Sequence, residues 1–167
     1  MTVGFSLYAG GVTLPDHFSA HFTQMITNTK KKVIKYSGKV RFSNPSLMKW
    51  DYVKPTKKEV CTNGRELTVV DHDLEQISTY LISKGFNLSE IIKKAKEHSQ
   101  NIYVARYAGK SYTVKTDRKG RLQSVAYYDD LDNKVQIIFN NIKYEKGAFD
   151  MQSMTCSHPK DYDEIRG

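Results

Sequence analysis

The sequence predicts a mainly β fold of roughly ten antiparallel strands, the number expected of a barrel or a sandwich. Apolar and aromatic side chains recur at every second residue in the first third of the chain. Turn signals then interrupt the sequence at short intervals, as in an antiparallel meander. We expect one domain, because 167 residues can enclose one core but are too few for two ordinary ones.

The first three strands are predicted within residues 18–55. Successive side chains of a strand point to opposite faces, so every second residue shares a face. In each of these strands one face carries large apolar side chains, and its members are Phe18, Ala20, Phe22, Val40, Phe42, Met48, Trp50 and Tyr52. The simplest interpretation is a sheet that packs its core with this face.

Further strands are predicted between the later turn signals. They cover residues 66–70, 76–82, 102–107, 111–116, 122–128 and 134–139. The clearest turn is Asn63-Gly64, because a tight hairpin needs positive φ at both central positions and this pair tolerates it. Some strands are apolar on both sides, as in Val69-Val70. A sheet with a cavity on one side and a partial cover on the other explains this pattern, and so does a simple sandwich.

One segment has the periodicity of an amphipathic helix. Either Asn87 or Ser89 can cap the free N–H groups of its first turn. Its apolar face consists of Leu88, Ile91, Ile92 and Ala95, and lysines lie on the other side. The helix is expected to end near Ser99. On pattern alone it would plug one end of a barrel.

The charge of the chain restricts its partners. Lysine and arginine number 26 against 18 acidic residues, which gives a formal net charge of +8. Phosphate binding depends on such charge, but the lysines gather at expected turns and on the helix face, and no aromatic and basic nucleic-acid motif is present. We therefore expect no nucleic-acid partner. A basic surface still favours anionic phospholipid or an acidic protein.

Hydropathy excludes a membrane-spanning helix. No apolar run reaches the ~18 to 20 residues that such a helix needs, and hydrophobic residues make up only 39% of the chain, so the sequence predicts a soluble protein. Its start lacks the basic region and long apolar core of a secretory signal. Residues 1–15 are interpreted as a processed or engineered start, and an exported protein would have lost its signal from this sequence.

The two cysteines leave two interpretations open. Cys61 and Cys156 pair in an oxidising compartment, or they are two free buried thiols. Neither outcome decides the function, because local spacing indicates no base that would activate a catalytic cysteine.

Histidine and acidic residues do not indicate an enzyme. The five histidines are scattered and comprise His17, His21, His72, His98 and His158. The tightest polar cluster, Asp71-His72-Asp73, lies where a hairpin should turn, and turn chemistry accounts for it without a metal. Phosphate loops, nucleophile elbows and zinc-binding spacings are missing from the sequence. We predict no enzymatic activity, no metal and no cofactor.

A series of motifs follows in order along residues 18–82. They read Phe18-x-Ala20-x-Phe22-x-Gln24, Gly38-x-x-x-Phe42, Asn44-Pro45-x-Leu47-Met48-x-Trp50-x-Tyr52-x-x-Pro55, Asn63-Gly64-x-x-Leu67 and Asp71-x-Asp73-Leu74-x-Gln76. In order and spacing they resemble the LolA family, the outer-membrane lipoprotein carrier proteins of Gram-negative bacteria. The resemblance is thinner after residue 82. It implies an incompletely closed antiparallel β-barrel of roughly ten to twelve strands, whose concave apolar face is covered by a helical lid.

The resemblance also implies a function. Family members are periplasmic chaperones that shield the acyl chains of lipoproteins and carry them from the inner to the outer membrane. The expected cavity lining is Phe18, Phe22, Phe42, Met48, Trp50 and Tyr52, and the expected inner face of the lid is Leu88, Ile91 and Ile92. The N-terminal part of the lid is in question, because residues 1–15 contain three glycines and a proline and make a poor helix.

The same resemblance implies partners. An inner-membrane ABC transporter complex loads such a carrier, and an outer-membrane acceptor unloads it, while the carrier itself is expected to be a monomer. In well-known members an arginine implicated in handing cargo onward precedes the proline of the strand-turn-strand unit. Asn44 holds that position here and is the hand-over candidate. The alternative function is binding of another lipophile, by a small-molecule or phospholipid barrel or by the related acceptor.

Overall fold

The computed structural model of the chain describes residues 11–43, 45–81 and 86–166. Within these residues it contains a 12-stranded sheet, one α-helix and a short 3-10 helix. The strands are β1 His17–Thr27, β2 Val33–Ser43, β3 Leu47–Lys54, β4 Lys58–Thr62, β5 Glu66–Asp71, β6 Gln76–Leu81, β7 Lys96–Ser99, β8 Ile102–Tyr107, β9 Lys110–Thr116, β10 Leu122–Tyr128, β11 Lys134–Tyr144 and β12 Asp163–Arg166. The helices are α1 Leu88–Lys94 and η2 Met151–Met154.

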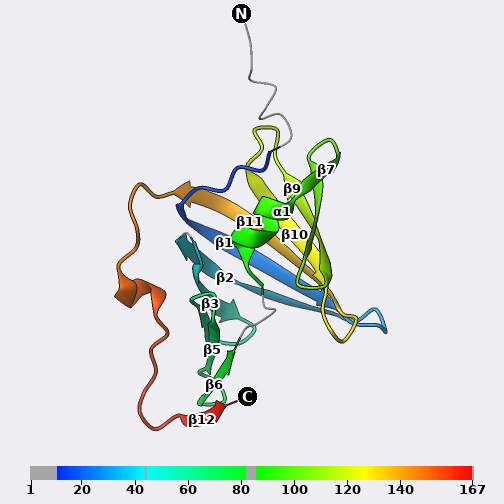
Figure 1. Cartoon of the computed structure of the whole chain (residues 1–167). Helices are drawn as coiled ribbons and strands as arrows, with labels where there is room; N and C mark the ends of the chain where they lie inside the picture. Colours follow the sequence, from blue (N-terminus) through cyan, green and yellow to red (C-terminus); the bar gives the residue numbers. More distant parts are fainter. Residues whose placement is uncertain (1–10, 44, 82–85, 167) are drawn as a thin grey trace, which may run out of the picture.

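The sheet consists of two antiparallel meanders joined by one long-range pairing. Its strand order is β12-β6-β5-β4-β3-β2-β1-β11-β10-β9-β8-β7, and only β12 pairs in parallel, with β6. Figure 1 shows that the sheet is strongly curved. The predicted mainly β class is confirmed. The sheet does not close into a barrel, because β12 and β7 are its two edges.

The predicted alternation places the core on one face of the sheet, here called the inner face. Phe18 lies opposite Phe42, and Val40 lies opposite both Ala20 and Trp50. Strands β8 to β11 contribute the other wall with Tyr103, Ala105, Tyr112, Val114, Leu122, Val125, Val135, Ile137 and Phe139. Burial of these side chains supplies the main stabilisation of the fold.

Gly38 permits the close approach of β2 and β3 beside this core. A Cβ atom at this position would collide with the backbone carbonyl of Asp51. The strand register shifts at the same point, between Ser37 and Gly38, so that Gly38 lies opposite Tyr52. A side chain here would push β3 away and displace Trp50 and Tyr52 from the inner face.

The predicted helix is present but shorter than expected. Asn87 caps it, since its side-chain oxygen accepts a hydrogen bond from the Glu90 N–H at 3.2 Å. The expected end near Ser99 is wrong: α1 ends at Lys94, and the following residues form the edge strand β7. Ala95 already has extended backbone angles, and pairing with β8 supplies the hydrogen bonds that another helical turn would have made.

A lid of several helices is not seen in the described part of the chain, where α1 is the single α-helix. It packs mainly against β8, and Leu88 and Ile91 belong to the core cluster. The start of the described chain is extended: Thr13 pairs with Arg121, and Val12 and Leu14 pack against the core. The expected N-terminal lid segment within residues 1–10 lies outside the described residues.

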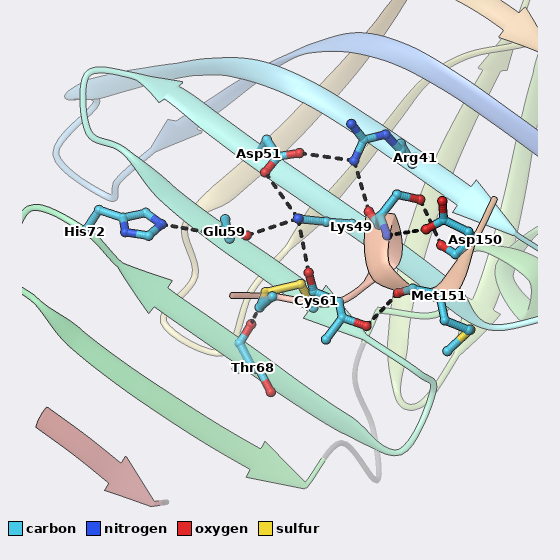
Figure 2. A network of polar contacts seen from close by, with 12 residues as sticks. Arg41, Lys49, Asp51, Glu59, Cys61, Thr68, His72, Asp150 and Met151 are labelled. Atoms are coloured by element: carbon cyan, nitrogen blue, oxygen red, sulfur yellow. Dashed lines mark hydrogen bonds and ion pairs between the residues drawn. A yellow bond between two sulfur atoms is a disulfide. The ribbon is translucent and has the colours of Figure 1, made fainter. Parts of the chain in front are cut away.

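Residues 150–162, here called the C-terminal strap, lie against the outer face of the sheet. The disulfide Cys61–Cys156 joins the strap to β4, with 5.8 Å between the Cα atoms. Arg41 donates to the Ser153 carbonyl at 3.0 Å and Lys49 donates to the Thr155 carbonyl at 3.1 Å. Figure 2 shows these contacts together with the pairing of Lys49 and Glu59, whose Nζ and Oε1 atoms are 3.0 Å apart. The strap thus fastens β2, β3 and β4 from outside.

Candidate functional site: an apolar pocket on the inner face

The inner face contains a small pocket lined by residues of β1, β3, β4, β5, β10, β11 and the segment before α1. Its volume is about 180 Å³. The lining residues are Gln24, Trp50, Tyr52, Val60, Thr62, Leu67, Phe86, Tyr127 and Ile137. None of these nine side chains carries a formal charge at neutral pH. The pocket is therefore suited to an apolar group rather than to an ion.

Aromatic rings form much of its wall. Trp50 and Tyr52 point to the inner face from neighbouring positions of β3, and both contact Phe22 edge to face, at 5.0 and 4.9 Å between ring centroids. The Tyr52 hydroxyl donates to the side-chain oxygen of Gln24 at 2.8 Å. The Tyr52 hydroxyl is thus satisfied within the protein, and its ring adds apolar surface to the pocket wall.

Phe86 lines the pocket from the segment before α1. Its ring centroid lies 6.3 Å from that of Trp50, 6.0 Å from that of Tyr127 and 6.2 Å from that of Tyr112. It directly precedes the cap residue Asn87 and is only partly buried. Phe86 thus contacts rings from both walls of the sheet, with Trp50 on β3 and Tyr112 and Tyr127 on β9 and β10.

Electrostatics keep the pocket neutral. Burial raises the pKa of Tyr52, and the neighbouring Tyr127 raises it further, while the hydrogen bond to Gln24 acts in the opposite direction. Burial also raises the pKa of Tyr127. At the outer rim Lys58 lies over the Tyr52 ring at 4.5 Å, and burial lowers the pKa of its ammonium group. Both phenols stay uncharged throughout the neutral pH range.

The size of the pocket limits what it can hold in this state. An apolar cavity of about 150 Å³ accepts one benzene molecule, and ligand pockets usually exceed about 300 Å³. The volume of about 180 Å³ therefore fits only part of an acyl chain.

Apolar surface continues beyond the pocket on β5 and β6. Leu67 lies opposite Tyr80, and Val69 lies opposite Val60 on the same inner face. Leu67 and Val69 are half-buried and Tyr80 is 42% exposed. This strip is less covered than the core between β1 and β11, so a long apolar ligand that fills the pocket would extend along it.

The pocket includes only part of the predicted lining. Trp50 and Tyr52 line it, whereas the packed core contains Phe18, Phe22, Phe42 and Met48, each at most 3% exposed. The predicted lid residues Leu88 and Ile91 are buried, and Ile92 packs against the core from the edge. A cavity-lining role for these buried residues stays a prediction. Asn44 lies outside the described residues.

Sequence reasoning did not single out Phe86, Val60, Leu67 or Tyr127 as lining. The strand alternation contained a signal for three of them, because Val60, Leu67 and Tyr127 lie on the inner face of predicted or neighbouring strands. Phe86 had a different signal: an apolar residue directly before a helix cap commonly packs against the helix or its surroundings.

The polar clusters lie elsewhere and have structural partners. The Asp71 carboxylate accepts the backbone N–H groups of Asp73 and Leu74, which makes it a turn residue. His72 is 2.6 Å from Glu59 and 3.0 Å from the hydroxyl of Tyr162. Among the described residues there is no group of three or more side chains that could hold a metal ion.

Comparison with known proteins identifies the family. A family model described as outer membrane lipoprotein carrier protein LolA matches residues 15–152. The chain belongs to the LolA family. Two LolA relatives are named outer-membrane lipoprotein carrier protein. That of Campylobacter jejuni is 36% identical over 89% of this chain and 86% of its own length, and that of Wolinella succinogenes is 32% identical over 74% and 72%.

Solved structures support the LolA fold. An uncharacterized conserved protein from Thermus thermophilus superposes with a TM-score of 0.57 at 11% identity, over 92% of each chain. A LolA superfamily protein from Nitrosomonas europaea gives a TM-score of 0.51 at 9% identity, over 87% of this chain and 92% of that chain. Within the described residues, no helix has both the length and the hydropathy to cross a membrane.

Proposed function

We propose that this protein is a periplasmic chaperone that shields the acyl chains of lipoproteins and carries them from the inner to the outer membrane. The observation that carries the proposal is an uncharged pocket, continued by an apolar strip, in a chain of the LolA family. The relatives named as lipoprotein carriers supply the cargo class. No catalytic step is part of this function.

Partial shielding suits a protein that must release its cargo. Full burial of one acyl chain of ~16 carbons is worth on the order of 12 kcal/mol, at ~0.8 kcal/mol per methylene group. Several such chains held completely would exceed the practical ceiling of affinity, about 18 to 21 kcal/mol. A pocket of about 180 Å³ beside an open strip buries only part of each chain. The cost of displacing Phe86 lowers the affinity further, and release stays feasible.

The disulfide supports a periplasmic location. Cys61 and Cys156 are joined, and such bonds persist in oxidising compartments such as the bacterial periplasm. An inner-membrane ABC transporter complex that loads the carrier and an outer-membrane acceptor that unloads it complete the proposal. Asn44 is the proposed hand-over residue. The protein acts as a monomer.

Binding of a triacylated lipopeptide to the purified protein tests the proposal. Trp50 is the single tryptophan and lines the pocket, so entry of an acyl chain should change its fluorescence. Leu67→Glu places a charge on the half-buried wall and should leave the protein folded but weaken binding about tenfold or more. The matched control is Leu74→Glu, at a turn leucine that is 65% exposed. Equal binding by both variants would contradict the site.

Mass spectrometry of organic extracts distinguishes the carrier from a general lipid binder. The protein is purified after co-expression with a bacterial lipoprotein. Recovery of a triacylated protein in a one-to-one complex supports the carrier function. The alternative is a module for another lipophile, and it is favoured by the lack of any charged group among the lining residues that would recognise a particular head group. Recovery of free fatty acid or phospholipid alone would establish that alternative.

A further inference from the structure

The hairpin between β1 and β2 has a composition that the carrier function does not account for. Residues 28–35, here called the basic tip, contain four lysines and no acidic residue. Lys30, Lys31, Lys32 and Lys35 are exposed, and none of them forms an ion pair in the described part of the chain. Figure 1 shows this turn projecting from one end of the sheet. Unpaired cations at a projecting turn are free to meet an external anion.

The tip also exposes two large apolar side chains. Val33 is 56% exposed and Ile34 is 51% exposed. They are consecutive in β2 and therefore point to opposite faces of the hairpin. In the adjoining turn, joined to the tip through the pairing of Thr27 with Lys134, Leu131 is 78% exposed. Apolar groups on both faces of a basic loop suit the boundary between lipid head groups and acyl chains.

The neighbouring charges leave the tip basic. The adjoining turn carries three acidic residues, of which Asp130 pairs with Lys110 at 2.9 Å. Asp129 and Asp132 keep their negative charge, but the four lysines of the tip outnumber them. On the other side the register of β2 with β3 brings Lys54 opposite Ser37, and Lys57 follows in the same exposed turn. The basic groups thus extend across two neighbouring turns of this end of the sheet.

We propose that the basic tip docks the protein on a membrane surface rich in anionic phospholipid. The lysines attract the phosphate head groups, and Val33 and Ile34 enter the outermost part of the acyl region. The combination distinguishes this partner from a nucleic acid, because a phosphodiester backbone offers no apolar layer to receive two exposed aliphatic side chains.

Docking at this point would turn the pocket toward the bilayer. Gln24 lines the pocket and lies on β1 four residues before the turn, roughly 13 Å along the strand. Tyr52 and Tyr127 likewise lie close to the turns that flank the tip. The use of the contact for acyl transfer rests on the proposed carrier function, whereas the contact itself does not.

Co-sedimentation of the full chain with lipid vesicles tests the proposal. The vesicles contain equal parts of phosphatidylglycerol and phosphatidylcholine, or phosphatidylcholine alone. We expect binding to the anionic vesicles to be about tenfold stronger or more, and to weaken as salt screens the charges. Equal binding to both vesicles, or no binding, would overturn the proposal and leave an acidic protein as the remaining partner for this surface.

Three variants locate the contact. Lys30→Glu/Lys32→Glu/Lys35→Glu should lower binding to anionic vesicles about tenfold or more. It leaves Lys31 unchanged because that residue has a positive φ of 68°. Val33→Ser/Ile34→Ser should lower binding several-fold while its salt dependence persists. The control for the lysine variant is Lys119→Glu/Lys143→Glu/Lys146→Glu. It makes the same change of net charge at three exposed lysines near the opposite end of the sheet.

The outcomes separate this proposal from the carrier function. A tip variant that loses vesicle binding but still changes Trp50 fluorescence with lipopeptide supports both ideas. If the protein binds vesicles through the basic tip but binds no lipopeptide, the carrier function is refuted and the membrane contact of the tip is retained. If the control variant loses as much vesicle binding as the lysine variant of the tip, docking through the tip is refuted, because net charge alone would then explain the attraction. Circular dichroism verifies that each variant is folded.

Discussion

Phe86 lines the pocket together with Trp50 and Tyr127. We propose that a bound acyl chain would displace this ring and its contacts with Trp50 and Tyr127. The affinity for cargo is the difference between the ligand's burial and that of the displaced ring.

Replacement of this ring should strengthen ligand binding. Phe86→Ala enlarges the pocket and removes the group that cargo must displace, so we expect about tenfold tighter binding of a lipopeptide. The free energy of unfolding should fall by about 1 to 3 kcal/mol, less than for a fully buried phenylalanine. Tyr107→Ala is the control, because Tyr107 packs against the core but does not line the pocket. Weaker binding by Phe86→Ala would show that the ring is part of the binding surface.

Glu59 gives the stability of the fold a pH dependence. Burial alone would raise the pKa of this carboxyl, but hydrogen bonds from His72 and Lys49 outweigh burial and hold the pKa below its usual range. The stabilisation is therefore present above the ordinary pKa of a glutamate, about 4.3, and is lost as the pH falls through the lower pKa of the folded state.

We expect Glu59→Gln to flatten the loss of stability in acid. Between about pH 5 and pH 3 the midpoint of urea unfolding should fall more steeply in the unchanged protein than in the variant. Glu145→Gln, at an exposed site, should follow the unchanged protein. Identical curves for Glu59→Gln and the unchanged protein would show that the contacts of the Glu59 carboxylate with His72 and Lys49 do not stabilise the fold.

At the scale of elements, the C-terminal strap forms a separate layer on the outer face of the sheet. Its own Met154 is buried, and two cationic side chains of β2 and β3 donate to its backbone carbonyls. Val70 and Ile77, which lie opposite one another on β5 and β6, face away from the pocket and are also buried. The outer face is thus a second, smaller apolar layer.

The disulfide should account for much of the attachment of the strap. Cys61→Ala/Cys156→Ala removes a link between residues 95 positions apart, and we expect the free energy of unfolding to fall by about 2 to 4 kcal/mol. Urea denaturation measures this change. The unchanged protein in a reducing agent should unfold with the variant's midpoint. If the reduced protein keeps the stability of the oxidised one, the polar contacts alone hold the strap.

At the scale of the whole molecule, the open sheet has two edges that could pair with another chain. The β7 edge is entirely exposed and carries Lys96, Glu97 and His98. The β12 edge carries Asp163, Glu164 and Arg166. Charged side chains on an edge strand disfavour pairing between sheets, because they would have to lose their hydration. The edges are therefore protected by composition rather than by closure.

Removal of these charges should cause self-association. Lys96→Val/Glu97→Val leaves the net charge unchanged and gives β7 two strand-favouring apolar residues, so we expect dimers or larger species at concentrations on the order of 100 µM. Light scattering during size-exclusion chromatography detects them. Glu145→Val/Lys146→Val, outside both edges, is the control. A monomeric edge variant would mean that curvature rather than charge protects β7.

Elements that are stabilised by local signals could be predicted from the sequence, whereas elements that depend on a partner strand could not. The strands at residues 102–107 and 122–128 agree with β8 and β10, because alternation and turn residues are local signals. Strand β7 was expected to be helical, since Lys96–Ser99 has no alternation and becomes a strand only through its partner β8. Strand β12 likewise depends on β6.

The candidate site was predicted in part for a similar reason. Trp50 and Tyr52 could be assigned to the inner face from their spacing, but spacing alone does not distinguish a residue beside a pocket from one in a filled core. Met48 and Phe42 have the same alternation and are packed on all sides. The pocket forms where Trp50 and Tyr52 meet Phe86 and Tyr127, which come from other parts of the chain. The local pattern of β2 or β3 cannot predict this contact with other parts of the chain.

The seam between β1 and β11 has a consequence for the order in which the chain assembles. Phe22 lies opposite Phe139, so residues from opposite parts of the sequence must meet before the two meanders share a core. Each meander consists of neighbouring strands that can pair early, whereas the seam closes a long loop and must wait for residues 134–144. In a newly made chain, the edge of β1 that pairs with β11 therefore stays unpaired until nearly the whole chain has been synthesised. During this interval a general folding chaperone would bind most usefully.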